Sequence, residues 1–174
     1  GGALEELNYE GYAPGGVAVL VNCLSDNRNR TAADVRAIFT KNNSSLAGSG
    51  AVAWLFNRKA RFLVENADEE SILEALLEAE SDPDEVNETG DGNVEVLAAP
   101  ELFGNVKDAF AESGLSIEES GLTMVPDNTV TVEEPSVARQ VVRLVDALED
   151  IEDVQEVTAN FEFTDEVIAA LEND

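Results

Sequence analysis

The chain has no histidine, a single cysteine and few basic residues. Its 174 residues include 10 lysines and arginines against 37 aspartates and glutamates, which gives a net charge of −27 at pH 7. Without histidine there is no imidazole base, no histidine-dependent triad and no HExxH zinc site. The single Cys23 excludes an internal disulfide and a cysteine-rich zinc site, and it fits a reducing compartment. We therefore expect a protein that is not an enzyme and that needs no metal or cofactor.

Long hydrophobic runs are also missing. No run of about 18 apolar residues is present, so we expect no transmembrane helix, and no signal peptide is recognisable. Apolar residues still make up 44% of the chain, which is enough for packed cores. We expect a cytoplasmic protein with neither a membrane partner nor a small-molecule substrate.

The few basic residues are concentrated in one part of the chain. Seven of the ten lie between Arg28 and Arg61, where Asp34 is the only acid, so this segment has a net charge of +6. A positive segment in so acidic a chain usually faces a polyanion. The surrounding acidity has three open explanations: it offsets a missing basic domain, reflects a salt-rich source organism, or repels nucleic acid from other faces.

Two clusters in this segment are the main candidates for nucleic-acid contact. Arginine offers a planar fork that matches phosphate, and asparagine adds neutral donors. We expect both clusters at strand ends, close together if the two strands are neighbours. The alternative is a solvated strand edge, or ion pairs with the chain's many carboxylates. The clusters are Asn27, Arg28, Asn29 and Arg30, followed by Arg58, Lys59 and Arg61.

Two further basic residues and a glycine-rich turn are weaker candidates. Arg36 and Lys41 lie about 140° apart around a helix, so they cannot both reach one ligand. In the turn Tyr12-Ala13-Pro14-Gly15-Gly16, glycine permits a close backbone approach and positive φ, so amides could reach phosphate. The turn lacks the Lys-Ser/Thr ending of a P-loop, and a strand follows it. Turn formation alone is the alternative explanation for Tyr12, Pro14, Gly15 and Gly16.

Hydrophobic periodicity predicts strands alternating with helices. One helix should follow a capping box of Thr31 and Asp34, and a second should be capped by Asn66. That second helix should bury Ile72, Leu73, Leu76 and Leu77. The expected strands are residues 17–24, 51–56, a strand beginning at 62, 94–98, 122–125, 129–133 and 157–163.

This order of elements predicts an α+β fold. It is typical of two ferredoxin-like βαββαβ units, one inserted into the other. The host domain would comprise residues 1–61 and 127–174 and would carry the basic clusters. Residues 62–126 would form the inserted acidic domain, with breaks near residues 57–60 and 126–128.

Three stretches carry a family resemblance. They are Tyr9-Glu10-Gly11-Tyr12-Ala13-Pro14-Gly15-Gly16, Asp26-Asn27-Arg28-Asn29-Arg30 and Ser49-Gly50-Ala51-Val52-Ala53-Trp54-Leu55-Phe56. Together they resemble the signature of the YebC/PmpR family over nearly the whole chain. This chain differs at Ala13 and Trp54, where glycine and tyrosine are expected. Family members typically begin with a basic, lysine-rich helical domain, so we expect this chain to be a fragment that lacks it.

The resemblance implies a role in gene expression and the same nested layout. Members of the family have been described as DNA-binding transcriptional regulators and as translation factors on the ribosome, including a mitochondrial translational activator. We expect a non-enzymatic nucleic-acid-binding regulator, and we favour a ribosome-associated translation factor that contacts ribosomal RNA. An acidic body with one basic segment suits a defined docking site better than scanning of duplex DNA. No helix-turn-helix or zinc finger is recognisable.

Two alternatives remain open. The first is a transcriptional regulator that binds promoter DNA. The second is an acidic protein-interaction scaffold, because acidic surfaces steer basic partners. Its contact residues would be Glu69, Glu70, Glu74, Glu78 and Glu80.

Overall fold

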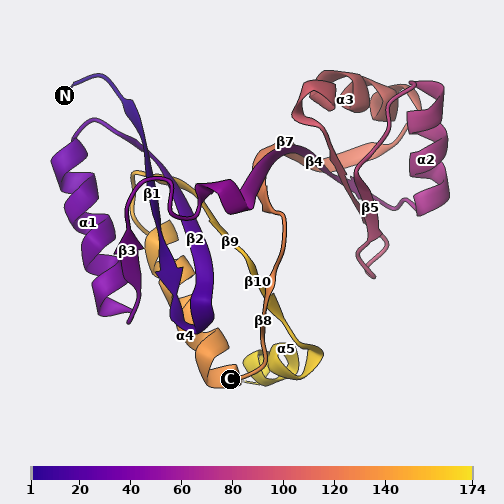
Figure 1. Cartoon of the computed structure of the whole chain (residues 1–174). Coiled ribbons are helices and arrows are strands. Elements are labelled where there is room, and N and C mark those ends of the chain that lie inside the picture. Colours follow the sequence, from indigo (N-terminus) through magenta and orange to yellow (C-terminus); the bar gives the residue numbers. More distant parts are fainter. Residues whose placement is uncertain (1, 174) are drawn as a thin grey trace. The chain divides into compact units, whose positions relative to one another are not determined.

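The structure, a computed structural model, describes residues 2–173 as two compact units. Unit 1 is built from the chain up to Phe56 and from Pro126 onward, and unit 2 is built from Asn57–Val125 (Figure 1). Both contain antiparallel sheets and helices, in agreement with the α+β class. The first division falls after Phe56 rather than after residue 61, because β4 (Phe56–Glu65) is one uninterrupted strand.

Unit 1 is organised around a long β hairpin. Its strands are β1 (Glu5–Ala13) and β2 (Val17–Ser25), paired from Glu5 with Ser25 to Ala13 with Val17. β3 (Ser45–Ala47) pairs with β1, and β9 (Val154–Ala159) pairs with β2, which gives the sheet order β3-β1-β2-β9. β1 was not among the strands expected from the sequence.

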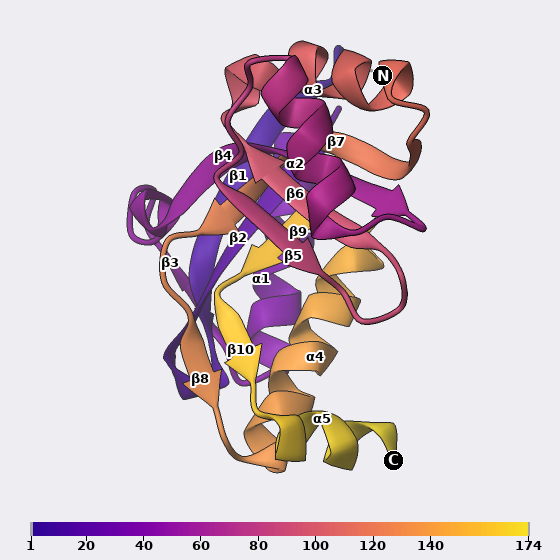
Figure 2. The same ribbon diagram turned by 90° about the vertical axis from the view of Figure 1, so that its right-hand side faces the viewer.

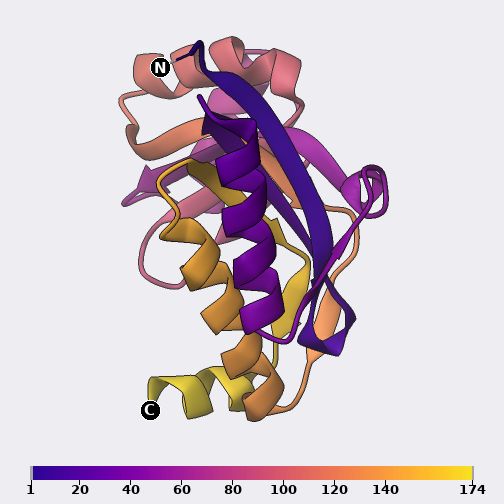
Figure 3. The same ribbon diagram turned by 90° about the vertical axis from the view of Figure 1, so that its left-hand side faces the viewer.

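Two helices cover one face of this sheet. They are α1 (Arg28–Lys41) and α4 (Pro135–Glu149), which run side by side in Figure 3. Pro135 occupies the first turn of α4, where its missing N–H costs nothing. The core between helices and sheet contains Val19, Val21, Val35, Phe39, Val141 and Leu144.

The end of the chain completes unit 1. The strand expected at residues 157–163 is divided at Asn160 into β9 and β10 (Phe161–Phe163). The buried Asn160 holds this break in place, because its Oδ1 accepts a hydrogen bond from the Ala18 amide at 2.8 Å. β10 pairs in parallel with β8 (Val130–Val132), and α5 (Asp165–Glu172) follows, capped by the Thr164 side chain.

Unit 2 has one sheet and two helices. After β4 come α2 (Glu69–Glu78), β5 (Glu85–Glu88), β6 (Val94–Ala98), η3 (Pro100–Leu102), α3 (Phe103–Glu112) and β7 (Ser116–Pro126). The sheet order is β5-β6-β4-β7, and Figure 2 shows α2 and α3 on one of its faces. Phe62 lies at the centre of the core, with its ring centroid 5.2 Å from that of Phe103 and 5.5 Å from that of Phe110.

Helix α2 differs from its sequence-based prediction. Its N-cap is Asp68, whose side chain accepts from the Ser71 amide, so Asn66 lies before the helix. Leu73 and Leu77 are exposed rather than buried, with exposed fractions of 42% and 80%. The buried face is narrower than predicted because the core accommodates only Ile72, Ala75 and Leu76 of this ten-residue helix.

Among residues 2–173, no helix combines the length and the apolar character that crossing a bilayer requires.

Candidate nucleic-acid interface

The first basic cluster lies in the first turn of α1 rather than at a strand end. Asn27 is the N-cap, and its side-chain oxygen accepts a hydrogen bond from the Arg30 amide at 3.1 Å. The helix therefore begins at Arg28, and the predicted capping box at Thr31 does not form. Asn29 is exposed in the same turn. Asn27 acts in the structure as a helix cap, which is a sufficient reason for an asparagine at this position.

Acidic side chains compensate the two arginines of this turn. Arg30 Nη2 lies 2.9 Å from Asp153 Oδ2 and 3.0 Å from Asp26 Oδ1, and Arg28 Nη2 lies 2.6 Å from Glu5 Oε2. A helix N-terminus already carries partial positive charge, so two arginines there need nearby anions. Hydrogen bonds to these carboxylates raise the pKa of both guanidinium groups, for Arg28 through Glu5 and for Arg30 chiefly through Asp153.

Asp153 also anchors α1 to the turn before β9. It accepts a hydrogen bond from the buried Thr31 hydroxyl at 2.7 Å, while its backbone oxygen accepts from the Leu24 amide at 2.8 Å. The Thr31 bond and then the Arg30 bond lower the pKa of this carboxyl. Arg30 and Asp153 therefore have a structural role in addition to any role in binding.

The second basic cluster lies on β4 in unit 2. Lys59 Nζ is 2.7 Å from Asp84 Oδ2, and Arg61 is 2.7 Å from Glu95 and 2.9 Å from Glu119. Arg58 is exposed and forms no ion pair with any residue from 2 to 173. The two clusters follow β2 and lie on β4, which belong to different sheets, so the strands are not neighbours as the expected proximity required.

Four of the five proposed cationic contacts are therefore already engaged by carboxylates. This is the ion-pair alternative that the sequence left open. The pairs of unit 1 are solvent-exposed, with Arg28 and Glu5 side chains 64% and 50% exposed. Exposed pairs contribute little stability and are screened by salt, so a phosphate can replace the carboxylate partner. Arg61 is more enclosed: burial opposes its charge, but two carboxylate bonds outweigh that effect and raise its pKa.

The outer face of α1 adds two cations that the sequence analysis ranked lower. Arg36 and Lys41 are exposed, and neither forms an ion pair with the described residues. At about 100° per residue, Lys41 lies only about 20° from Arg30 around the helix, and Arg36 lies about 80° from Arg28. The helix thus presents two cationic flanks. Between them runs a ridge of small or neutral exposed side chains, namely Asn29, Ala33, Ala37 and Thr40.

The glycine-rich turn connects β1 to β2. Pro14–Gly16 form a short 3-10 turn in which Gly15 and Gly16 have φ angles of 84° and 77°. These left-handed conformations favour glycine, so turn formation accounts for both residues. Tyr12 is 40% exposed at the end of β1. The hollow beside Gly15 is also lined by Glu133 and Glu134, whose charge disfavours phosphate.

Sequence reasoning missed the buried carboxylate of Glu10. Its Oε1 accepts hydrogen bonds from the Val52 and Ala53 amides at 2.8 and 2.7 Å, and its Oε2 accepts from Gly50 at 2.7 Å. Burial alone would raise the pKa of Glu10, but the three amide bonds outweigh it and lower the pKa. The segment expected as a strand at residues 51–56 is instead η2 (Ala53–Leu55), because its preceding amides bind this carboxylate.

Within the described part of the chain, no three histidine, cysteine, aspartate or glutamate side chains are grouped to hold a metal ion. The chemistry available at this surface is therefore that of charge and hydrogen bonding.

Comparison with known proteins identifies close relatives. A family model described as the TACO1/YebC second and third domain matches residues 4–161. A "Probable transcriptional regulatory protein" of Chromohalobacter salexigens is 46% identical over 173 residues, covering 99% of this chain and 69% of that protein. A protein of the same description from Synechocystis is 46% identical over 95% of this chain and 66% of its own length.

A solved structure is also similar. The crystal structure of a conserved hypothetical protein from Aquifex aeolicus aligns with a TM-score of 0.84 and 40% identity, covering 95% of this chain and 68% of that one. The chain thus spans about two thirds of the length of the relatives it matches. With a family model over most of its length and relatives above 40% identity, the chain belongs to the TACO1/YebC family.

Proposed function

We propose that this chain is a non-enzymatic regulator of gene expression that binds nucleic acid through the exposed face of α1. One observation carries the proposal: in a chain of net charge −27, this helix has four cations against one acid. Arg36 and Lys41 are exposed and form no ion pair with the described residues, while Arg28 and Arg30 hold carboxylates at exposed positions. Phosphate contacts supply most of the affinity of such surfaces.

The shape of this face supports a polyanion as the ligand. Small side chains between two cationic flanks let the helix approach closely while each flank meets phosphates. Asn29 adds a neutral donor on the ridge. Arg58, Lys59 and Arg61 are secondary contacts in this proposal, because only Arg58 is without an ion pair among the described residues.

Of the possible targets, we favour structured RNA of the ribosome. The family model carries the name TACO1/YebC, and relatives are described as probable transcriptional regulatory proteins, so both RNA and DNA are targets to test. The acidic body repels a polyanion except at α1, which suits one defined docking site in a large assembly. Scanning of duplex DNA depends on backbone attraction that this charge weakens.

Co-sedimentation tests the choice of target. The chain is spun with purified ribosomes at several salt concentrations, with and without nuclease, and in parallel it is incubated with labelled duplex DNA. Binding to ribosomes that falls with salt and is lost after nuclease treatment supports the ribosomal role. Sequence-selective DNA binding that survives about 200 mM salt, without ribosome binding, supports the transcriptional role.

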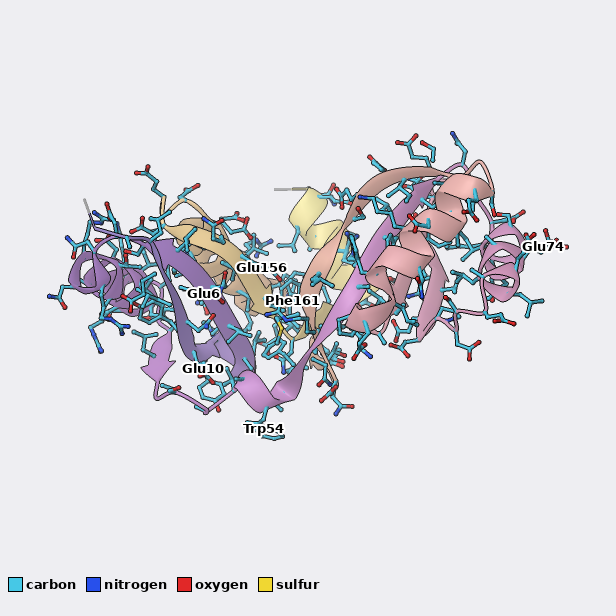
Figure 4. All side chains as sticks on the ribbon, turned by 90° about the horizontal axis from the view of Figure 1, so that it is seen from above. Glu6, Glu10, Trp54, Glu74, Glu156 and Phe161 are labelled. Carbon is cyan, nitrogen blue, oxygen red and sulfur yellow. The ribbon has the colours of Figure 1, made fainter. Side chains whose placement is uncertain are left out.

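A second candidate function is an acidic docking scaffold, which the exposed face of α2 favours. Leu73 and Leu77 are exposed there beside Glu69, Glu70 and Glu74, and Figure 4 shows Glu74 projecting outward from unit 2. Apolar anchors with an acidic surround suit a basic amphipathic segment. Capture of one basic protein after nuclease treatment, lost in Leu77→Ser and kept in an Arg36→Glu variant, would support this function over RNA binding.

We also infer that residues 57–125 form an inserted ferredoxin-like domain. The succession β4-α2-β5-β6-α3-β7 and the sheet order β5-β6-β4-β7 support this, because they match the βαββαβ pattern with its last strand beside the first. Unit 1 begins with a hairpin, so its relation to that pattern is less direct. Expression of residues 57–125 alone tests the inference, which predicts a cooperative unfolding transition.

A further inference from the structure

The most exposed aromatic side chain of unit 1 is Trp54, the only tryptophan in the chain. It lies in η2 and is 72% exposed, although tryptophan is mostly buried in folded proteins. Its indole N–H donates to the Ala51 carbonyl oxygen at 3.1 Å. The ring therefore has its polar group already satisfied. Figure 4 shows Trp54 projecting from the ribbon.

The turn that carries Trp54 is held by an unusual number of backbone contacts. The buried Glu10 carboxylate binds the amides of Gly50, Val52 and Ala53, on the residues immediately before Trp54. The Leu55 amide also donates to the Val52 carbonyl at 2.9 Å. A ring on so constrained a backbone loses little freedom when it meets a partner, and such preorganisation favours binding.

The surroundings of Trp54 distinguish between two kinds of partner. A protein-docking anchor normally sits among other apolar contacts that exclude water. No other large hydrophobic side chain between Gly48 and Phe56 is strongly exposed. A single flat ring is sufficient for stacking on a nucleobase, and every base has a face that can stack. Tyr12, 40% exposed, extends from the same face of β1 as Glu10.

We propose that Trp54 is a stacking platform for an unpaired nucleobase of the bound nucleic acid, held in position by the Glu10 carboxylate. This inference rests on the proposed function and extends it: the cations of α1 contact phosphates, whereas Trp54 requires a base that is not in a duplex. The ligand class is therefore single-stranded nucleic acid, or an RNA with an unpaired loop or bulge.

The only tryptophan of the chain is also the reporter for the test. Intrinsic fluorescence is titrated with a 12-nucleotide oligoadenylate and with an abasic oligomer of equal length that has the phosphates but no bases. Binding itself is measured separately by the anisotropy of an end-labelled oligoadenylate. We expect quenching by the oligoadenylate and not by the abasic oligomer.

Substitutions complete the test. Trp54→Ala should weaken binding of the oligoadenylate about 5-fold to 150-fold, the range expected for loss of one stacked base. Trp54→Phe should retain most of the affinity, and Leu4→Ala, at an equally exposed apolar residue of unit 1, should retain all of it. Circular dichroism of each variant verifies the fold.

The outcomes separate this inference from the proposed function. If labelled RNA binds but Trp54 is not quenched and Trp54→Ala binds as well as the parent, the stacking role is wrong and the nucleic-acid function stands. Equal quenching by the abasic oligomer also overturns stacking. If no RNA binds even at low salt, or if Trp54 is quenched only by a protein partner, both proposals fail.

Discussion

Arg30 and Asp153, separated by 123 positions in the sequence, are joined by a hydrogen bond of 2.9 Å between Nη2 and Oδ2. The same Asp153 oxygen accepts the Thr31 hydroxyl at 2.7 Å. The contact links the start of α1, the most basic element, to the turn that precedes β9. The cation that we expect to meet phosphate thus also belongs to the framework that positions the helix.

This relationship predicts that Thr31 matters more for stability than the charge of Arg30. Thr31→Val should lower the free energy of unfolding by about 1–3 kcal/mol, because it leaves buried polar partners without their hydrogen bond. Arg36→Gln, on the exposed face of the same helix, is the control and should leave stability unchanged. Urea denaturation followed by circular dichroism measures both. Equal stability of Thr31→Val and the parent would show that the network does not anchor α1.

Glu10 should stabilise unit 1 in a pH-dependent way. Glu10→Gln places an amide group among three backbone donors and should cost about 1–3 kcal/mol at pH 7. Because folding lowers the pKa of Glu10, its contribution is present above the unfolded value near 4.3 and is lost as pH falls through the lower folded value.

The measurement is the difference in unfolding free energy between parent and variant at pH 7 and at pH 3. The difference should shrink at the lower pH. Glu6→Gln is the control, since Glu6 is an exposed residue of the same strand (Figure 4). A constant difference at both pH values would mean that the charge of Glu10 is not what holds the turn.

Two glycine substitutions should have opposite effects. A Cβ on Gly11 would lie 2.5 Å from the Ser45 oxygen and 2.6 Å from Phe39 Cε1, so Gly11→Ala should destabilise the protein by about 1–3 kcal/mol. Gly104→Ala meets no atom within 4 Å and lies in α3, so it should stabilise by up to about 1 kcal/mol. Thermal unfolding of both variants tests the packing of α1 on β1.

Cys23 should be unreactive in the folded protein. It is fully buried, and burial together with the nearby Asp153 raises the pKa of its thiol to about 11. The thiolate is the reactive form, so little of it exists at pH 8. A thiol reagent should modify the protein at pH 8 only after denaturant is added, and the rate should follow unfolding. Rapid labelling of the native protein would contradict the packing of β2.

Much of the fold follows from local patterns in the sequence. The apolar run of β2, the stripe of Val35 and Phe39 on α1, and Pro135 at the start of α4 each lead to the element observed. The signal for β1 was also present, in the alternation of Leu7, Tyr9, Gly11 and Ala13, although it was overlooked. Leu73 and Leu77 have the spacing of a core face, but the core of unit 2 does not extend to them.

The candidate site was less predictable, because its contacts are distant in sequence. Local composition identified the basic segment but not which of 37 acids would pair with Arg28 or Arg61. Glu10 lies 40 or more residues from the amides that it binds, and no local pattern marks that contact. For the same reason Arg36 and Lys41 were ranked below cations that the fold engages in ion pairs.

The most direct test of the central claim is RNA binding by charge-reversed α1, measured over a salt series. We compare the parent chain with Arg36→Glu/Lys41→Glu, and with Lys107→Glu on α3 as the control for net charge. The double variant should bind more weakly, and its slope of log affinity against log salt should fall by about 0.7 for each lost phosphate contact with single-stranded RNA. The Lys107→Glu variant should keep the parental slope. Equal affinity and slope for the parent and the double variant would show that α1 is not the nucleic-acid contact surface.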